Sequence, residues 1–467
     1  MSRPLLSPSH GNRRSAESGD MRAADLRELA VAAANFAQNW RDTSQVARAN
    51  LVHRLVDVLA PKIDDLAVLM AQKLGKPIRF GRTEGRQSLE MLQAILRRTE
   101  GHHGLAEEYK THVVMRRPHG VVAAITPWNN PIYIALGKIV PAILYGNAVV
   151  WKPAPEARSV SRHLLRCFVT ASWPGELVNL LEGGSHEAEA LMNERSIDAV
   201  TITGSAAAGD SAQEICARRH VPLQAELGGN NASIVWSDAD LPEAARKVAA
   251  GAFEMAGQRC TANRRVIVHA ACLNRFVELL VKAAAAMQWG DPLDGGTEIG
   301  PLVSASHRDR VAGAVALAVA QRGSELLPLG ERPPTVGEHE GKFYPPTIIN
   351  CNDPAHDIVQ EETFGPVLVV QPAQDWDEAI RLCNGVRQGL AAAVFATSPD
   401  KVRNFIERAR AGILKVNEAT AGAVVDAPFG GWKASGVGLP EHGSFDVEFF
   451  TRPQTVYRDR RVRGSSS

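Results

Sequence analysis

One cysteine stands in a segment that could support chemistry: FEMAGQRCTANRRVIVH, residues 253–269. Cys260 follows Arg259 and precedes Thr261, with small residues on both sides. A positive neighbour favours the thiolate, and small residues leave room for a substrate carbonyl. Most cysteines of a reducing compartment are instead small buried hydrophobic residues, so this segment alone leaves a catalytic and a structural interpretation open.

The remaining cysteines give no sign of chemistry. We expect them to be buried hydrophobic residues: Cys167, Cys216, Cys272, Cys351 and Cys383. No Cys-x-x-Cys pair occurs and no histidine stands at a metal-ligand spacing near Cys260, so no metal is expected. Six cysteines in 467 residues do not form a disulfide framework, which favours a reducing, cytoplasmic location.

The composition excludes several classes of partner. With 52 Lys and Arg against 51 Asp and Glu, the net charge is +1, which gives no general attraction to nucleic acid or to a membrane surface. The most apolar window, residues 132–151, is interrupted by a lysine, a proline, a glycine and an asparagine, so no membrane span is expected. Residues 1–22 are largely polar, lack the apolar stretch of a signal peptide, and are predicted to be a disordered tail.

The elements that must position Cys260 alternate between strands and helices. Short β-rich runs end in turn residues, with helical stretches between them: GVVAAITPW, NAVVWKPAP, DAVTITGS and NASIVWSD. This alternation predicts a parallel α/β sheet. A second series, from RRVIVH to AGILKVN, predicts a second α/β domain of similar size, and a chain of 467 residues also favours more than one domain.

The two ends of the chain have different predictions. Ordered structure is expected from about Ala23, where apolar residues repeat at helical spacing up to Trp40, and Thr43 or Ser44 can cap the next helix. The strand-like run EYKTHVVMRRP near residue 110 and the C-terminal FFTRPQTVYRDRR have no place in either predicted sheet. They are predicted to form a small sheet that joins subunits.

Three loops follow predicted strands, at the edge where open α/β sheets bind ligands. They are TPWNN after VVAAI, KPAP after AVVW, and TGSAAAG after AVTI. In TGSAAAG, Gly204 lets the backbone approach a ligand, and Ser205 offers a hydroxyl at a helix N-terminus, where the dipole favours phosphate. The usual GxGxxG fingerprint is absent, so an ordinary helix N-cap at Ser205 fits equally well.

Nine motifs recur in a family order: TPWN, GNAVVWKP, TGS, ELGGNN, GQRCTANRR, GDP with IGPL, EETFGPVL, NGVRQGLAAAVFA and APFGGWKASGVG. From about residue 23 to residue 457, the chain resembles the aldehyde dehydrogenase superfamily in its non-acylating, NAD(P)-dependent form. The resemblance implies a homodimer or a homotetramer of α/β subunits with three parts. These are a Rossmann-like cofactor domain over residues 23–105 and 120–228, a catalytic domain over 229–443, and oligomerisation strands at 106–119 and 444–459.

The resemblance implies three catalytic residues. Cys260 resembles the nucleophile, whose thiolate attacks an aldehyde to form a thiohemiacetal that gives hydride to a nicotinamide and leaves a thioester. Asn129 resembles the oxyanion donor, acting with the backbone N–H of Cys260. Glu226 resembles the general base for thioester hydrolysis, a role that a raised pKa would suit. Without the motifs, Asn129 fits a turn and Glu226 a solvated carboxylate.

The resemblance also implies residues that bind NAD or NADP. Lys152 would hold the adenosine ribose, Glu362 the nicotinamide ribose, and Phe364 would lie beside the nicotinamide ring. Lys138 is a lesser candidate for a place near the site. The other cofactor-binding residues are expected in the loops after the strands: Thr126, Pro127, Trp128, Gly204 and Ser205.

Cofactor preference stays open at one position. Many NAD-preferring relatives have a glutamate three residues after the lysine of WKP, where this chain has Pro155 and then Glu156. Proline accepts no hydrogen bond from the ribose 2′-hydroxyl through a side chain, and it removes a charge that would repel a 2′-phosphate. NAD, NADP or both are therefore expected.

The substrate pocket is expected to include Arg259, Tyr133, Gly137, Phe429 and Thr261. Arg259 could bind an anionic aldehyde such as a semialdehyde, or it could point away to a structural carboxylate. Gly137 is expected to open the channel, since many relatives have a large side chain there. The segment 418–428 is expected to line the mouth of the pocket, with Asp426 its one internal charge.

Two other functions compete with the oxidation of a free aldehyde to an acid. A coenzyme A-acylating dehydrogenase is disfavoured because such relatives generally lack the glutamate at Glu226. A catalytically inactive binding or structural protein of this fold is disfavoured by the complete set of catalytic and cofactor residues.

Overall fold

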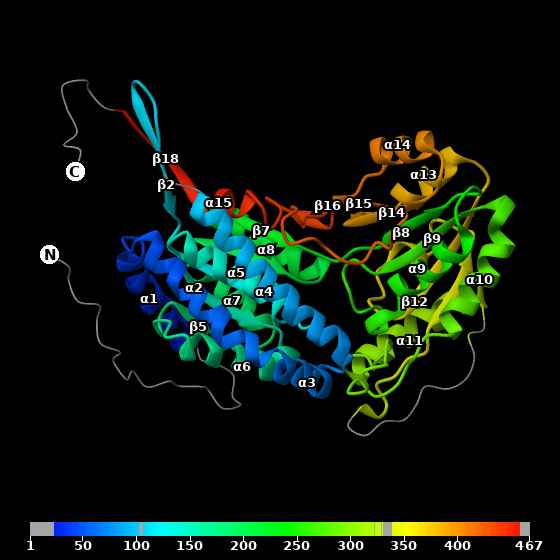
Figure 1. The fold of residues 1–467 in the computed structure, drawn as a ribbon, viewed down its shortest axis with the longest axis horizontal. Helices are drawn as coiled ribbons and strands as arrows, with labels where there is room; N and C mark the ends of the chain where they lie inside the picture. Colours follow the sequence, from blue (N-terminus) through cyan, green and yellow to red (C-terminus); the bar gives the residue numbers. More distant parts are fainter. Residues whose placement is uncertain (1–22, 102–105, 322, 328, 330–338, 458–467) are drawn as a thin grey trace.

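Two bodies, each a sheet covered by helices, lie side by side, and a small sheet projects from one of them (Figure 1). The computed structural model describes residues 23–457 except 102–105, 322, 328 and 330–338. The predicted tail of residues 1–22 lies outside the described residues. The arrangement confirms the predicted α/β class with two sheets.

The first body contains a six-stranded sheet in the order β17-β7-β6-β3-β4-β5. All neighbours are parallel except β17, which is antiparallel to β7. The chain runs outward from β3 in one direction and then returns to the other side of β3, which makes the carboxyl end of β3 a topological switch point suited to ligands. The strands are β3 (Val121–Thr126), β4 (Ala148–Pro153), β5 (Val178–Leu180), β6 (Ala199–Thr203), β7 (Leu223–Glu226) and β17 (Gly436–Val437).

The first helix begins at Ala23, as predicted, and Ser44 caps the second by accepting a hydrogen bond from the N–H of Ala47. Gly75, with a φ of 70°, ends α3 in the left-handed conformation that glycine adopts without steric cost. The helices of this body are α1 (Ala23–Trp40), α2 (Gln45–Leu59), η1 (Ala60–Lys62), α3 (Ile63–Leu74), α4 (Ile78–Gly101), α5 (Tyr133–Leu144), η2 (Pro155–Ala157), α6 (Arg158–Thr170), α7 (Ser185–Asn193), α8 (Ala206–Arg219) and α15 (Phe445–Phe450).

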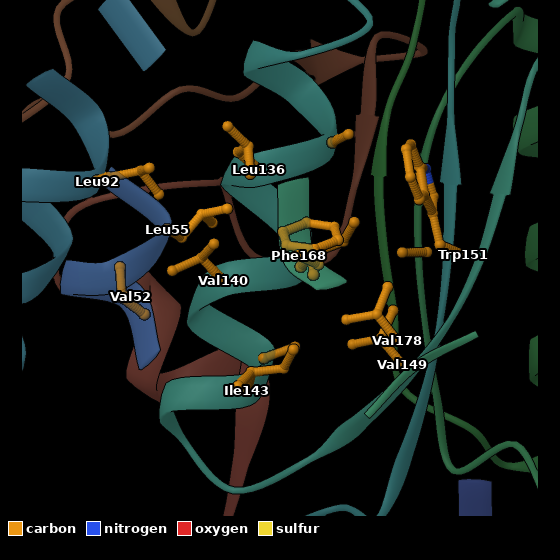
Figure 2. Close-up of a cluster of buried hydrophobic side chains, with 14 of the residues drawn as sticks. Val52, Leu55, Leu92, Leu136, Val140, Ile143, Val149, Trp151, Phe168 and Val178 are labelled. Atoms are coloured by element: carbon orange, nitrogen blue, oxygen red, sulfur yellow. The ribbon is translucent and has the colours of Figure 1, made fainter. Parts of the chain in front are cut away.

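Apolar side chains of α2, α5 and α6 meet those of β4 and β5 in the core of the first body (Figure 2). Leu55, Val140 and Phe168 lie on the helix side of this cluster, and Trp151 lies on β4. The buried indole N–H of Trp151 donates a hydrogen bond to Oγ1 of Thr126, 2.8 Å away. The core therefore extends directly to the first of the loops predicted to bind a ligand.

The second body contains a seven-stranded sheet in the order β10-β11-β12-β9-β8-β14-β15, parallel except at β10. Its strands are β8 (Asn231–Val235), β9 (Asn263–His269), β10 (Ser324–Leu327), β11 (Thr347–Cys351), β12 (Val367–Ala373), β14 (Ala391–Phe395) and β15 (Ile413–Val416), with β13 (Gln388–Gly389) and β16 (Trp432–Lys433) as a separate pair. Its helices are α9 (Leu241–Phe253), η3 (Glu254–Gly257), η4 (Ala270–Cys272), α10 (Leu273–Ala285), α11 (Ala305–Ala320), α12 (Asp357–Gln360), α13 (Trp376–Asn384) and α14 (Pro399–Arg408).

The small sheet joins segments far apart in the chain. β1 (Ala106–Glu108), β2 (His112–Pro118) and β18 (Thr451–Tyr457) pair antiparallel in the order β1-β2-β18 and project beyond α15 (Figure 1). The predicted pairing of these two segments is confirmed, and their role in joining subunits stays a prediction. None of the described helices combines the length and the apolar character that a membrane span needs.

Trp151→Ala is expected to destabilise the first body by about 3–5 kcal/mol, because it leaves a cavity in the core. Trp151→Phe, which keeps an aromatic ring but loses the hydrogen bond to Thr126, should cost about 1–2 kcal/mol. Urea unfolding followed by near-ultraviolet circular dichroism measures both. Trp432→Ala is the control, because that side chain is 55% exposed. Equal midpoints for Trp151→Ala and Trp432→Ala would contradict the packing argument.

Candidate active site

The segment before the nucleophile has an unusual backbone. Met255, Ala256 and Gly257 have φ values of 56°, 54° and 67°, so three successive residues are left-handed at the end of η3. A Cβ on Gly257 would lie 2.3 Å from the carbonyl oxygen of Gly365, which only glycine avoids. Backbone strain of this kind persists where the surrounding structure holds it, as is common at functional sites. The turn brings Cys260 to the junction of the two bodies.

Two asparagines fix the nucleophile segment from opposite sides. Nδ2 of Asn231, at the start of β8, donates to the carbonyl oxygen of Cys260 at 2.7 Å. Nδ2 of Asn129, in the loop after β3, donates to the carbonyl oxygen of Gln258 at 3.2 Å. The structure therefore brings the predicted oxyanion donor to within two residues of the predicted nucleophile, from another sheet.

Glu226 ends β7 and is 3% exposed. Its Oε2 accepts a hydrogen bond from the N–H of Gly431 at 3.1 Å. Burial raises the pKa of this carboxyl well above its usual value, Glu441 raises it further, and Lys138 opposes the shift. A raised pKa suits general acid–base work, the role predicted for Glu226.

Sequence reasoning missed Glu441 as part of this cluster. The ammonium of Lys138 contacts the Glu441 carboxylate and lies 2.9 Å from Oγ1 of Thr201. Thr203 also donates to Glu441, at 3.3 Å. A lysine within the apolar helix α5 signals that a buried anion must pair with it, because an isolated buried charge is very costly. Which carboxylate serves is decided only by folding, since 303 positions separate the partners.

Arg259 and the thiolate attract each other, but this attraction does not give the thiol a low pKa. Its guanidinium pairs with Glu254 at 3.1 Å and donates to the carbonyl oxygens of Ala250 and Gly251 at 2.9 and 3.1 Å. The structure thus favours the structural interpretation of Arg259 over that of a free anion-binding group. The half-buried Cys260 instead has its pKa raised to about 12, mainly by burial and then by Glu362 and Glu226. The thiol needs a base before it can attack.

Glu362 lies against the glycines of the ELGG motif. Its Oε1 accepts a hydrogen bond from the N–H of Gly229 at 3.3 Å, and a Cβ on Gly228 would lie only 2.0 Å from its Oε2. Burial raises the pKa of Glu362 to about 7, against the opposing effect of the Arg264 guanidinium. Arg264 also lies over the ring of Phe364, 5.6 Å from its centroid, so both predicted nicotinamide-side residues surround one cation.

The predicted cofactor loops meet at the carboxyl ends of β3, β4 and β6, on the switch-point side of the sheet. Lys152 is 4% exposed, and its side-chain ammonium makes no ion pair or hydrogen bond within the described part of the chain. Burial lowers the pKa of its ammonium, against Glu187 and Glu156. A buried donor without an acceptor fits the hydroxyl groups of a dinucleotide ribose. The remaining residues of these loops line the same edge: Thr126, Pro127, Trp128 and Gly204.

Ser205 acts as an ordinary helix cap in this structure. Its hydroxyl accepts a hydrogen bond from the N–H of Ala208 at 3.3 Å, at the start of α8. Both alternatives from the sequence remain compatible with this position, because the side chain is exposed and its hydroxyl has a further lone pair.

The expectation that Gly137 opens the channel is wrong. A Cβ at this position would lie 2.9 Å from Cε1 of His442 and 3.3 Å from Sδ of Met91, so other side chains fill the space. Tyr133 packs edge-on against His442 at 5.8 Å, and its buried hydroxyl has no hydrogen-bond partner among the described residues. Sequence reasoning missed His442, which follows Glu441 directly.

Hydrogen bonds and one ion pair hold the remaining residues expected in the substrate pocket and in the segment 418–428. Thr261 is buried and its carbonyl oxygen accepts from Oγ1 of Thr420 at 2.7 Å. The backbone of Phe429 pairs with that of Glu441 at 2.8 and 2.7 Å. In the mostly exposed segment 418–428, Asp426 pairs with Arg98 at 3.0 Å.

Comparisons with known proteins give matches over nearly the whole chain. The profile described as "Aldehyde dehydrogenase family" matches residues 3–456. An alpha-ketoglutaric semialdehyde dehydrogenase of Bacillus subtilis (strain 168) is 33% identical over 436 residues, covering 92% of this chain and 89% of the relative. The succinate semialdehyde dehydrogenase [NAD(P)+] Sad of Escherichia coli (strain K12) is 33% identical over 442 residues, covering 92% of each chain.

A solved structure shows the same fold. The NAD-dependent aldehyde dehydrogenase of Sinorhizobium meliloti superposes with a TM-score of 0.88 and 31% identity, covering 95% of this chain and 88% of that one. The chain belongs to the aldehyde dehydrogenase family. It is an oxidoreductase that oxidises an aldehyde with NAD or NADP. The names of these relatives fit aldehyde oxidation with NAD or NADP and give no support to the coenzyme A-acylating alternative.

Glu362→Gln is expected to speed the alkylation of Cys260 by iodoacetamide at pH 8–9. Loss of the negative charge lowers the pKa of the thiol, and the effect should weaken below about pH 7, where Glu362 is itself protonated. For each tenfold gain in thiolate, the lower nucleophilicity leaves a gain of roughly threefold in rate. Mass spectrometry of the labelled peptide measures the rate. Glu361→Gln, at the exposed neighbouring carboxylate, is the control and should change nothing; an unchanged rate in Glu362→Gln would contradict the electrostatic argument.

Proposed function

We propose that Cys260, Glu226 and Asn129 carry out the oxidation of an aldehyde to a carboxylic acid through a covalent thioester. The observation that supports it most is the position of the thiol, which lies close enough to Glu226 for the carboxylate to raise its pKa. The Asn129 amide reaches the backbone of the same segment from the other sheet. Nucleophile, base and amide donor are therefore gathered where the two bodies meet.

The first step needs removal of the thiol proton. Glu226 is the proposed acceptor, because its own raised pKa brings it closer to that of the thiol. The sulfur then bonds to the aldehyde carbon, and negative charge develops on the oxygen. Nδ2 of Asn129 and the N–H of Cys260 are the proposed donors to that oxygen, a contribution on the order of 10²–10³ in rate for one such donor.

The bound nicotinamide supplies the acceptor for the hydride that leaves the thiohemiacetal carbon. Lys152 and Glu362 are the proposed holders of its two riboses, with Phe364 beside the ring. Pro155 begins η2 next to this site, and no carboxylate side chain occupies that position, so we propose that both NAD and NADP are accepted.

The thioester is then hydrolysed by water that Glu226 deprotonates. Lys138 and Glu441 both shift the pKa of Glu226, so this cluster can hold the proton while the acid leaves. The ammonium of Lys138, paired with Glu441, offsets part of the cost of placing two buried carboxyl groups close together. The proposed role of Glu226 is thus supported by its neighbours.

Semialdehydes are the substrate class that we propose. Relatives covering 92% of this chain act on alpha-ketoglutaric and succinate semialdehyde by their names. Arg259 is engaged by Glu254, so the carboxylate of such a substrate would have to be bound elsewhere. A medium-sized aldehyde without charge is the alternative.

We further propose a cytoplasmic homodimer or homotetramer joined through β1, β2 and β18. Exposed aromatic residues of this small sheet support it, since Tyr109, in the turn between β1 and β2, is 52% exposed and Tyr457, at the end of β18, is 79% exposed. The proposed functional division is a cofactor domain over 23–105 and 120–228 and a catalytic domain over 229–443. Light scattering coupled to size-exclusion chromatography measures the mass of the assembly.

Cys260→Ala is expected to abolish turnover with a folded protein, because no other group can form the thioester. Reduced-cofactor absorbance at 340 nm measures turnover, and circular dichroism checks the fold. Cys383→Ala is the matched control, since that thiol is buried in the second body away from the site. Activity of Cys260→Ala near that of the wild type would remove the nucleophile assignment.

Glu226→Gln is expected to slow the burst of cofactor reduction, because the thiol loses its proposed proton acceptor, and to stall at the thioester after about one equivalent of cofactor per site. Stopped-flow absorbance measures the burst, and intact-protein mass spectrometry detects the acyl group on Cys260. A steady-state rate equal to that of the wild type would show that another base does the work.

A panel of neutral aldehydes and semialdehydes, each assayed with NAD⁺ and NADP⁺, tests the substrate and cofactor proposals together. We expect the highest kcat/KM for a semialdehyde and measurable turnover with both cofactors. A neutral aldehyde that exceeds every semialdehyde tenfold would overturn the substrate class without affecting the reaction type.

A further inference from the structure

A buried ion pair far from the nucleophile in sequence lies directly behind the loop of Asn129. Lys76 follows Gly75 at the turn between α3 and α4 and is 5% exposed. Its ammonium contacts Oε2 of Glu84 at 2.5 Å, the carbonyl oxygen of Asn129 at 2.9 Å and Oδ1 of Asn130 at 2.7 Å. All three donors of the ammonium are therefore used, and two of them hold the predicted oxyanion loop.

Glu84 holds the other side of the same loop. It lies on α4 and is 3% exposed. Its Oε1 accepts hydrogen bonds from the N–H groups of Ile132 and Tyr133 at 2.8 and 3.0 Å. These are N–H groups at the start of α5, where a helix has unpaired donors and a positive dipole end. The ion pair thus clamps the loop from Asn129 to the beginning of the helix.

The clamp acts on Asn129 at its main chain while the side chain points to the nucleophile segment. Lys76 binds the carbonyl oxygen of Asn129, and the amide of Asn129 donates to the carbonyl oxygen of Gln258. The Gln258 side chain is fixed in turn by Met255, Pro301 and Val303. Both ends of Asn129 are therefore held, so the direction of its amide is set before substrate binds.

Stability alone does not account for this pair. Replacing a buried ion pair by apolar residues of similar volume is often neutral or stabilising, so a buried pair is weak support for a stabilising role. Placement of a catalytic donor is different, because a misplacement of 1 Å can cost roughly 10²-fold in rate. The contacts of Lys76 and Glu84 converge on that placement.

We propose that the Lys76–Glu84 ion pair is a positioning device that aims the amide of Asn129 at the oxyanion formed on Cys260. The inference rests on the proposed role of Asn129. Neither residue touches the reacting atoms, so both act through Asn129. Lys76 and Glu84 keep the Asn129 amide in place while negative charge develops on the carbonyl oxygen of the substrate.

The test uses two reactions of Cys260 that differ in one respect. Acylation by p-nitrophenyl acetate passes through a tetrahedral oxyanion, whereas alkylation by iodoacetamide displaces iodide and forms none. Both need the thiolate and neither needs a nicotinamide. Lys76→Met should lower the acylation rate about tenfold and leave the alkylation rate within about twofold, because only acylation depends on the aim of the amide.

A double-mutant cycle with Asn129→Ala separates positioning from general damage. Asn129→Ala alone should lower acylation about 100-fold. Adding Lys76→Met to it should lower the rate by less than about twofold more, since residues that act through one group are not additive. Glu84→Gln keeps an acceptor for the helix N–H groups and serves as a second variant where Lys76→Met folds poorly. It should lower acylation about threefold with unchanged alkylation.

Arg48→Met is the matched control. Arg48 is also a buried cation, 4% exposed, and its guanidinium donates to the carbonyl oxygen of Leu144 at 3.0 Å, at the far end of α5. Its loss should lower the thermal midpoint without changing the ratio of acylation to alkylation. Equal slowing of both reactions by Lys76→Met, or its full effect in the Asn129→Ala background, would overturn the proposal.

The outcomes also separate this inference from the proposed function. Wild-type acylation in Asn129→Ala would remove the oxyanion role of Asn129 and the positioning role with it. Slow acylation in Asn129→Ala with a wild-type rate in Lys76→Met would remove the positioning role alone. Absence of NAD(P)-dependent aldehyde oxidation would count against the proposed function, and the two Cys260 reactions would still decide the role of Lys76.

Discussion

Burial of negative charge around one thiol is the constraint on which the site depends. Glu226 and Glu362 both raise the pKa of Cys260, and burial raises the pKa of both carboxyls in turn. Each carboxylate is tolerated because a buried cation lies near it, Lys138 for Glu226 and Arg264 for Glu362. In such a setting the resting thiol keeps its proton, and the raised pKa of Glu226 suits its proposed role as the base that takes it. The sulfur of Cys260 can therefore attack only after its proton has been transferred to a base.

Hydrogen bonds from side chains to backbone carbonyl oxygens hold many of the segments around that thiol in place. Arg264 donates to Gly365 and to residues of the nucleophile turn, and Asn231 holds the carbonyl of Cys260. Lys76 does the same for Asn129 on the opposite side. Hydrogen bonds from charged groups to backbone are strong and directional, so they fix loops that regular secondary structure cannot. This explains how a strained turn and an irregular loop can meet with defined geometry between two sheets.

Two expectations about the site depended on packing that the sequence does not show. Arg259 was expected to favour the thiolate because it is adjacent in sequence, but burial and the nearby carboxylates outweigh its charge, and its guanidinium pairs with Glu254 and the end of α9. Gly137 was expected to leave open space, but His442 fills it from a segment about 300 positions later. The direction of a long side chain and the occupant of a glycine's space are set by packing, which neighbouring letters of the sequence do not contain. The motifs indicated which residues could do chemistry, but not which side chains pack around them.

The sequence by itself determined the α/β alternation, the pairing of the segments near residues 110 and 450, and the family, because periodicity and motif order are local properties that survive without coordinates. It also indicated the proposed thiol, base and amide donor. Only the tertiary structure decided that Glu441 pairs with Lys138 and that Lys76 with Glu84 clamps the loop of Asn129. These contacts join elements whose order in the chain carries no information on their distance in space. A charged residue in an apolar segment indicates that a partner of opposite charge is needed, and only the folded chain decides which residue that partner is.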